Sequence, residues 1–124
     1  MESILLSINP EYVERIFSGK KRYEFRKRLA NRKVDRILIY STAPTKQVVG
    51  EVQIIETISS SPSELWERTK KFAGISRDKY RKYFKGCKIA YAYQLGQVIR
   101  YDPPKELSEF NVSQPPQSFI YLNR

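Results

Sequence analysis

The stretch ILLSINPEYVERIFSGKKRYEFR, residues 4–26, contains the signals of a strand, a helix and a second strand in succession. Residues 4–8 form an apolar run of strand length, and the Asn-Pro pair at 9–10 supplies a helix N-cap followed by proline at the first helical position. The apolar residues that follow recur at helical spacing up to Gly19, which suits a left-handed C-terminal cap. Residues 23–26 then alternate between aromatic and charged side chains, which predicts a half-buried strand.

The middle of the chain predicts a strand pair followed by two helices. Residues 34–42 (VDRILIYST) and 48–58 (VVGEVQIIETI) have the composition of strands, and the turn between them predicts a hairpin. Gly50 lies inside the second strand, where glycine marks a bulge or a close backbone approach. The sequence SPSE at 61–64 has the capping-box pattern of a helix start, and Ser76 is suited to cap a second helix.

The last third of the chain predicts further strands. Residues 89–95 read as a strand with 98–101 as its partner, Pro103-Pro104 predicts a loop, residues 106–110 a helical turn and residues 117–122 a last strand. No repeat or linker divides the sequence, so we expect residues 1–124 to form a single domain. The expected fold is α+β: a small mixed β-barrel of about six strands, with a helix after the first strand and an inserted helical pair.

The composition is strongly basic, with 23 Lys and Arg against 13 Asp and Glu and a formal net charge of +10. A field of this sign attracts the phosphates of nucleic acids. The same charge also suits an interaction module that docks to an acidic protein or to a ribosomal surface. Charge alone therefore leaves both classes of partner open.

Several kinds of site are excluded by residues that the chain lacks. It has no histidine and a single cysteine, Cys87, so it can form neither an internal disulfide, nor a zinc site of the usual Cys/His kind, nor a Ser-His-Asp triad. It has no glycine-rich phosphate loop and no acidic cluster, so we predict neither a cofactor nor a metal. Because the first residues do not resemble a signal peptide and no later run could span a bilayer, we expect no membrane association and a cytoplasmic protein.

The segment SGKKRYEFRKR at 18–28 places six basic residues around one acid, Glu24. Glu24 and Arg26 are two positions apart, so in a strand they emerge on the same face and can support each other. Lys21 has the opposite parity, but a bulge or twist after Gly19 could aim it at the same pocket. A carboxylate there accepts hydrogen bonds from the amine or imino group of a nucleobase. The alternative is a solvated edge strand whose charges prevent edge-to-edge pairing.

The pattern G-x-K-x-x-E-x-R, filled by Gly19, Lys21, Glu24 and Arg26, resembles the signature of the ASCH domain family. The first strand and helix, the turn with Ala-Pro at 43–44, the Val-Gly-Glu at 49–51 and the closing PPQSF at 115–119 extend the resemblance over essentially the whole chain. The resemblance implies a PUA-like barrel and a cleft built around the motif that opens onto a basic surface. It also implies binding of RNA or of a modified nucleoside or nucleotide.

The family also contains enzymes, so two catalytic alternatives follow from the resemblance. One branch hydrolyses N4-acylated cytidines, with a threonine nucleophile three positions after the lysine, where this chain has Glu24, and with a glutamate near 72–75, where it has none. In such an enzyme Lys21 would act as the base and Glu24 as proton shuttle or orienting group, with Glu51 a weaker candidate. Another branch contains metal-dependent ribonucleases, but metal-dependent cleavage requires converging carboxylates that the sequence does not display. Binding therefore ranks above catalysis, and whether the protein is an enzyme stays open.

The predicted nucleic-acid-binding residues lie in two groups. Basic residues of the second helix of the inserted pair could lie against phosphates or could form an ordinary solvated face. Aromatic side chains such as Trp66 and Tyr40 could stack on a base, but at strand or helix spacing such residues more often belong to the core. Nothing in the sequence indicates an oligomeric state. The predicted binding residues are Lys20, Lys21, Arg22, Glu24, Arg26, Lys27, Arg28, Arg77, Arg81 and Lys82.

Overall fold

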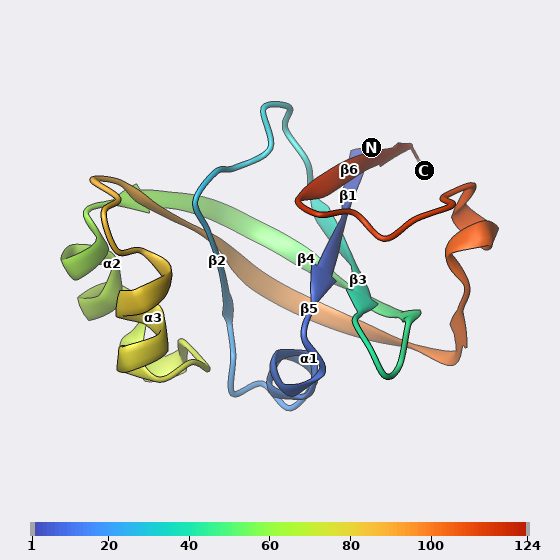
Figure 1. Cartoon of the computed structure of the whole chain (residues 1–124), viewed down its shortest axis with the longest axis horizontal. Coiled ribbons are helices and arrows are strands. Elements are labelled where there is room, and N and C mark those ends of the chain that lie inside the picture. The colour runs from blue at the N-terminus through green and yellow to red at the C-terminus, as the bar shows by residue number, and fades with distance from the viewer. Residues whose placement is uncertain (1, 124) are drawn as a thin grey trace.

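The computed structural model describes residues 2–123 and contains one six-stranded mixed sheet with three α-helices (Figure 1). The elements are β1 (Glu2–Ile8), α1 (Pro10–Phe17), β2 (Tyr23–Arg26), β3 (Arg36–Ser41), β4 (Gln47–Ser60), α2 (Pro62–Thr69), the 3₁₀ turn η1 (Lys70–Phe72), α3 (Arg77–Tyr83), β5 (Ala90–Lys105), the 3₁₀ turn η2 (Leu107–Phe110) and β6 (Phe119–Asn123). The strand order is β2-β5-β4-β3-β1-β6. The α+β class predicted from the sequence is therefore confirmed.

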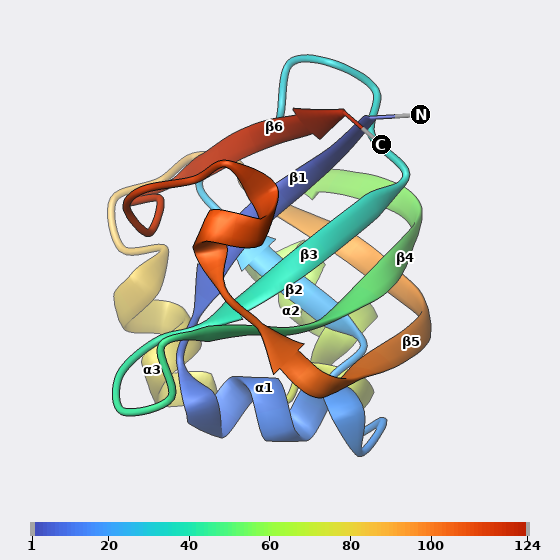
Figure 2. The same ribbon diagram turned by 90° about the vertical axis from the view of Figure 1, so that its right-hand side faces the viewer.

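Within the sheet, β1 runs parallel to β3 and the other neighbouring strands are antiparallel. The predicted hairpin of β3 and β4 is confirmed, with Arg36 opposite Gln53. Figure 2 shows the strands curving around a common interior, with α1 across one end. Val13 and Ile16 of α1 are buried against apolar side chains of β1 and β3, so this helix covers one end of the core.

The sheet does not close into the predicted barrel. Over residues 2–123, β2 pairs only with β5 and β6 only with β1, so each has one edge without a backbone partner. Between β2 and the end of β1 the contact comes from a side chain: Arg26 Nη2 donates to the backbone oxygen of Ser7 at 3.2 Å. The two strands are thus joined by a side chain, and an open seam remains between them.

The prediction of two short strands and a loop over residues 89–104 was wrong. The predicted strands at 89–95 and 98–101 do not pair with each other but, apart from Ile89, belong to one continuous strand, which also includes the predicted loop at Pro103-Pro104. The physical reason is the length of β4, which offers partners to β5 from Ser60 opposite Ala90 to Val48 opposite Lys105. Register shifts along this pair absorb the irregular residues. One of them lies at Gly50, where a Cβ would collide with the backbone oxygen of Ile99, so the predicted close approach is confirmed.

Residues 61–89, between β4 and β5, form a helical insert at one end of the sheet (Figure 1). Both predicted serine caps are confirmed: Ser61 Oγ accepts from the backbone N–H of Glu64 at 3.3 Å, and Ser76 Oγ accepts from that of Lys79 at 3.1 Å. The insert has its own apolar cluster, in which Leu65 and Tyr80 pack with Phe25 of β2. The insert is therefore packed directly against the strand that carries the signature motif.

The helix after β1 starts as predicted, with proline in its first turn, but Asn9 does not cap it through its side chain. Asn9 Oδ1 instead accepts from Thr42 Oγ1 at 3.1 Å and so joins the start of α1 to the end of β3. Gly19 has φ +82°, as a left-handed helix end requires. None of the helices described between residues 2 and 123 is long and apolar enough to cross a membrane.

Candidate functional site

The open seam between β2 and β1 contains a pocket of about 310 Å³, the size of a small ligand site. Its walls come from the end of β1, the start of α1, β2 and the insert. The motif residues Lys21, Glu24 and Arg26 all line it, together with the aromatic rings of Tyr12 and Tyr83. The failure of the sheet to close therefore creates the site.

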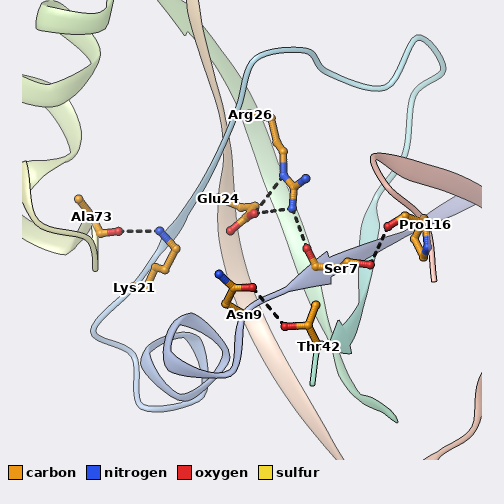
Figure 3. A network of polar contacts seen from close by, with 8 residues as sticks. All are labelled: Ser7, Asn9, Lys21, Glu24, Arg26, Thr42, Ala73 and Pro116. Atoms are coloured by element: carbon orange, nitrogen blue, oxygen red, sulfur yellow. Dashed lines mark hydrogen bonds and ion pairs between the residues drawn. The ribbon is translucent and has the colours of Figure 1, made fainter. Parts of the chain in front are cut away.

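Glu24 and Arg26 form the ion pair expected from their spacing (Figure 3). Arg26 Nη2 and Nε donate to Glu24 Oε2 at 2.8 and 3.1 Å. Glu24 is 7% exposed, so this charge is largely removed from water and depends on its partner. No hydrogen bond from residues 2–123 is recorded at its second oxygen, Oε1, which leaves that oxygen available to a ligand.

Lys21 reaches the pocket from outside the strand. It precedes β2, so strand parity does not govern it, and its backbone N–H donates to Arg15 O at 2.9 Å. Its side chain is buried, with Nζ donating to the backbone oxygen of Ala73 at 2.8 Å and lying 5.4 and 4.9 Å from the ring centroids of Tyr12 and Phe25. Removal from water lowers the pKa of Lys21 to about 8, although the nearby Glu24 carboxylate opposes this shift. The ammonium therefore still predominates at neutral pH, and the amine becomes neutral above about pH 8.

Three consecutive backbone carbonyls of the insert accept hydrogen bonds from residues 15–22 and hold the insert against this segment. The backbone oxygens of residues 72, 73 and 74 accept in turn from the backbone N–H of Arg22, from Lys21 Nζ and from Arg15 Nη1, at 2.8, 2.8 and 3.0 Å. Gly74 has φ +64°, which allows these carbonyls to be presented together. A Cβ at this position would lie 2.6 Å from Lys21 Cγ. The position of the buried amine thus depends on a glycine of the insert.

Gly74→Ala is expected to destabilise the protein by about 1–2 kcal/mol more than Gly86→Ala. Both glycines have positive φ, so either substitution costs about 1 kcal/mol of backbone strain, but only at Gly74 does the new methyl group meet another side chain. Urea denaturation of the two variants measures the difference. Equal losses would show that Lys21 moves aside without cost.

The structure separates Glu51 from the other candidate residues. Its carboxylate is buried on β4, where Oε2 accepts from Arg36 Nη1 at 2.6 Å and Oε1 from the Tyr101 hydroxyl at 2.7 Å. Glu51 does not line the pocket that contains Lys21 and Glu24. It holds three strands together instead.

Most of the predicted binding cations are exposed, but several have structural contacts. The Arg22 guanidinium lies 3.9 Å from the centroid of the Phe72 ring, Lys82 pairs with Asp78 at 3.1 Å, and Lys27 Nζ lies 5.1 Å from the Tyr83 centroid. The remaining exposed cations of the predicted set are Lys20, Arg28, Arg77 and Arg81.

Two residues of α3 that are not among the predicted binding residues also line the pocket. Tyr83 is 37% exposed and lines the pocket, as does Lys79 one turn earlier. Lys79 and Tyr83 are four residues apart, so both lie on one face of the helix, and this spacing is the signal that could have identified them. Tyr40 is buried in the core, as the alternative interpretation held, and Phe25 is buried as well.

The donor set of the pocket does not fit a divalent metal ion. Its one carboxylate is paired with Arg26 and lies near the Lys21 ammonium, both of which repel a cation. Over residues 2–123 there is no group of three or more His, Cys, Asp or Glu side chains that could hold a metal.

Comparison with known proteins identifies the class. The ASCH domain model matches residues 6–105, a span that contains the motif, strands β2 to β5 and the insert. The chain belongs to the ASCH domain family, as its resemblance to the signature indicated.

Characterised relatives include an ASCH domain-containing ribonuclease from Zymomonas mobilis, which is 36% identical over 124 residues and is matched over 97% of this chain and 84% of its own length. The crystal structure of ASCH from the same organism superposes with a TM-score of 0.86 at 35% identity, over 98% of this chain and 88% of that one. A serine-to-alanine variant of that protein gives a TM-score of 0.89 at 32% identity, over 98% and 89% of the two chains. The α+β fold is therefore that of the Zymomonas protein.

Other relatives are much longer proteins of Ureaplasma parvum. Large ribosomal subunit protein uL22 is 34% identical over 122 residues, which are 98% of this chain but 39% of that protein. ATP synthase subunit alpha is 32% identical over 122 residues, 15% of its length. The chain thus spans less than half of these relatives.

Proposed function

We propose that this protein binds unpaired RNA and holds one nucleotide in the pocket of Lys21, Glu24 and Arg26. The observation that carries the proposal is a buried carboxylate with one available oxygen, placed beside a buried amine in a pocket bordered by aromatic rings. The net charge of +10 favours a polyanionic ligand. A relative that is a ribonuclease supports RNA as that ligand.

Each group in the pocket has a role in this proposal. Glu24 Oε1 accepts an N–H from the base edge, and Lys21 donates to a base or ribose oxygen. The exposed Tyr83 ring offers a stacking surface, an interaction worth about 1–3 kcal/mol per base. The ammonium groups of Lys27 and Lys79 hold phosphate, which supplies affinity without selectivity.

Glu24→Gln is expected to weaken discrimination among bases more than it weakens overall RNA affinity. The amide keeps one acceptor but loses the negative charge, so a base that donates an N–H gains less than with the carboxylate. Fluorescence anisotropy with short single strands of C, A, G or U measures the preference. Glu67→Gln, at an exposed glutamate of α2, is the matched control. If wild type and Glu24→Gln rank the four bases identically, Glu24 does not read the base.

RNA cleavage is a second candidate function, favoured by the ribonuclease relative and by the lowered pKa of Lys21, about 8. In this reaction the neutral Lys21 amine takes the proton of a ribose 2′-hydroxyl. The 2′-oxygen then bonds to the adjacent phosphorus, and the bond from phosphorus to the 5′-oxygen breaks. The leaving oxygen takes a proton from water, which gives a 2′,3′-cyclic phosphate and a 5′-hydroxyl end. In this step Arg26 and Lys79, which line the pocket, stabilise the added negative charge.

One series of incubations separates binding from the catalytic alternatives. Short RNA is incubated with the protein in EDTA and, separately, in Mn²⁺, and N4-acetylcytidine is incubated under the same conditions. A cyclic phosphate product in EDTA that Lys21→Met abolishes supports the cleavage step above. Cleavage only in Mn²⁺ contradicts that step, and release of acetate from N4-acetylcytidine favours the amidohydrolase. If RNA binds but neither RNA nor N4-acetylcytidine gives a product, only the RNA-binding proposal remains.

A further inference from the structure

Asn9, at the start of α1, is the one amide among the described residues that line the pocket at the seam. The charged groups of the pocket are Lys21, Glu24, Arg26 and Lys79, all of which the proposed function uses. Asn9 is uncharged and exposed, so a ligand in the pocket can reach it. It is therefore a polar group of the site to which the proposed function gives no role.

The side chain of Asn9 does not make the contact that its position favours. An asparagine at a helix N-cap usually accepts a hydrogen bond from a backbone N–H of the first turn, which is worth about 1 kcal/mol. Asn9 has the extended backbone of an N-cap, φ −64° and ψ 144°, but its side chain makes no such bond. The proline after it has no N–H, and Tyr12 N–H donates to the backbone oxygen of Asn9 at 3.0 Å. The start of the helix thus needs the amide little, and the amide is used elsewhere.

Thr42 holds the Asn9 amide in one orientation. Thr42 Oγ1 donates to Asn9 Oδ1 at 3.1 Å, which turns the amide nitrogen, Nδ2, to the opposite side. Figure 3 shows this nitrogen turned toward Glu24 and Lys21. The backbone of Thr42 is itself fixed, because its N–H donates to Ile8 O at 3.1 Å. A hydroxyl on a fixed turn therefore determines which end of the amide faces the pocket.

The Asn9 nitrogen and the available oxygen of Glu24 complement the edge of a base. Asn9 Nδ2 makes no recorded hydrogen bond to residues 2–123, so its two N–H groups can donate to a ligand, whereas Glu24 Oε1 can only accept. Each RNA base carries, side by side on its Watson–Crick edge, an N–H donor and an acceptor oxygen or ring nitrogen. A phosphate offers acceptors only and would leave the Glu24 oxygen without a donor. The pair therefore fits a base better than it fits the backbone of the strand.

We propose that Asn9 is a base-reading residue and that Thr42 is the positioning residue that keeps its amide turned toward the pocket. Asn9 Nδ2 donates to an oxygen or ring nitrogen of the same base whose N–H is accepted by Glu24. The inference rests on the proposed RNA-binding function and adds to it a second contact by which the base is recognised. A ligand with the same sugar and phosphate but no base gains nothing from Asn9.

The test compares ligands with and without a base. The four nucleoside 5′-monophosphates and ribose 5-phosphate are titrated into wild type, Asn9→Ala, Thr42→Val and Thr42→Ser, with Asn31→Ala and Thr45→Val as controls at exposed positions. For the nucleotide that wild type binds most tightly, we expect Asn9→Ala to lose about fivefold in affinity, the contribution of one hydrogen bond. Binding of ribose 5-phosphate should not change, and the two controls should bind every ligand as wild type does.

The two variants at Thr42 test the positioning role. Valine has nearly the shape of threonine but no hydroxyl, so the amide can turn its oxygen toward the pocket, and we expect nucleotide affinity to fall about threefold. Serine keeps the hydroxyl and should restore the affinity of wild type. Adding Thr42→Val to Asn9→Ala should cause no further loss, because the hydroxyl acts only through the amide. In NMR spectra of wild type, the side-chain N–H₂ resonances of Asn9 should shift with the nucleotide and not with ribose 5-phosphate.

The failure of this inference is distinguishable from the failure of the proposed function. If Lys21→Met abolishes nucleotide binding but Asn9→Ala binds as wild type does, or weakens ribose 5-phosphate equally, the base-reading role is wrong and the proposed function stands. If Thr42→Val weakens binding as much in Asn9→Ala as in wild type, the positioning role is wrong. If no nucleotide binds to wild type, the inference and the proposed function are both wrong.

A purely structural role predicts a different result. Thr42 and Asn9 join the end of β3 to the start of α1, so their substitution in that case lowers the free energy of unfolding in urea and leaves the nucleotide affinity of the folded protein unchanged. That outcome contradicts the inference. The comparison of Thr42→Val with Thr42→Ser tests it even if Asn9→Ala does not fold.

Discussion

Arg26→Met is expected to lower the free energy of unfolding by about 3–5 kcal/mol at pH 7, the cost of leaving a buried charge without its partner. Glu24 is 7% exposed, and its Oε2 accepts from both Nε and Nη2 of Arg26. The substitution also removes the contact of Arg26 with Ser7 O, which joins β2 to β1 across the seam. Urea denaturation at pH 7 measures the loss.

A double-mutant cycle separates the charge effect from the packing effect. Adding Glu24→Gln to Arg26→Met removes the unpaired charge, so we expect the double variant to recover more than half of the lost stability. The single variant Glu24→Gln should cost less than Arg26→Met. If the double variant is as unstable as Arg26→Met, the loss comes from the seam contact with Ser7 and not from the ion pair.

Lys21→Met should remove a pH-dependent contribution of about 3 kcal/mol to the free energy of unfolding. The pKa of Lys21 is about 8 in the folded protein against 10.5 for an ordinary lysine, because burial disfavours the ammonium. Between these two pH values the unfolded chain binds more protons than the folded one, so stability from this group rises with pH. The destabilisation caused by burying the Lys21 ammonium is fully present below about pH 8 and is lost by about pH 10.5. A difference of 2.5 units corresponds to about 3 kcal/mol.

The measurement compares wild type, Lys21→Met and the exposed control Lys88→Met at pH 7 and at pH 10.5. The free energy of unfolding of wild type minus that of Lys21→Met should rise by about 3 kcal/mol between the two pH values, and the same difference for Lys88→Met should stay flat. A flat difference for Lys21→Met would mean that the amine is not desolvated. The proposed function adds a second expectation, that the same variant loses RNA binding, because the proposal makes the Lys21 amine a donor to the nucleotide.

Local signals predicted most of the elements. Pro10 starts a helix, Ser61 and Ser76 cap two others, and Gly19 ends α1 with positive φ. These features depend on groups within a few residues of one another, so the sequence contains the whole cause. The pairing of Glu24 with Arg26 belongs to the same class, because strand parity alone puts both on one face.

Features that depend on distant segments were not predictable in the same way. The predicted strands at 89–95 and 98–101 merged because β4 is long enough to pair with both, and over residues 2–123 the edge strands β2 and β6 do not pair with each other. The carbonyl that holds Lys21 belongs to Ala73, 52 residues away. No local pattern encodes that contact.

The sequence by itself determined the class of fold, the motif of the ASCH family and the charge that favours a polyanion. Only the tertiary structure decided that the sheet stays open, that the insert closes over Lys21, and that Tyr83 and Asn9 line the same pocket as the motif. The physical reason is desolvation. A lysine acquires a pKa of about 8 only when segments from different parts of the chain exclude water around it.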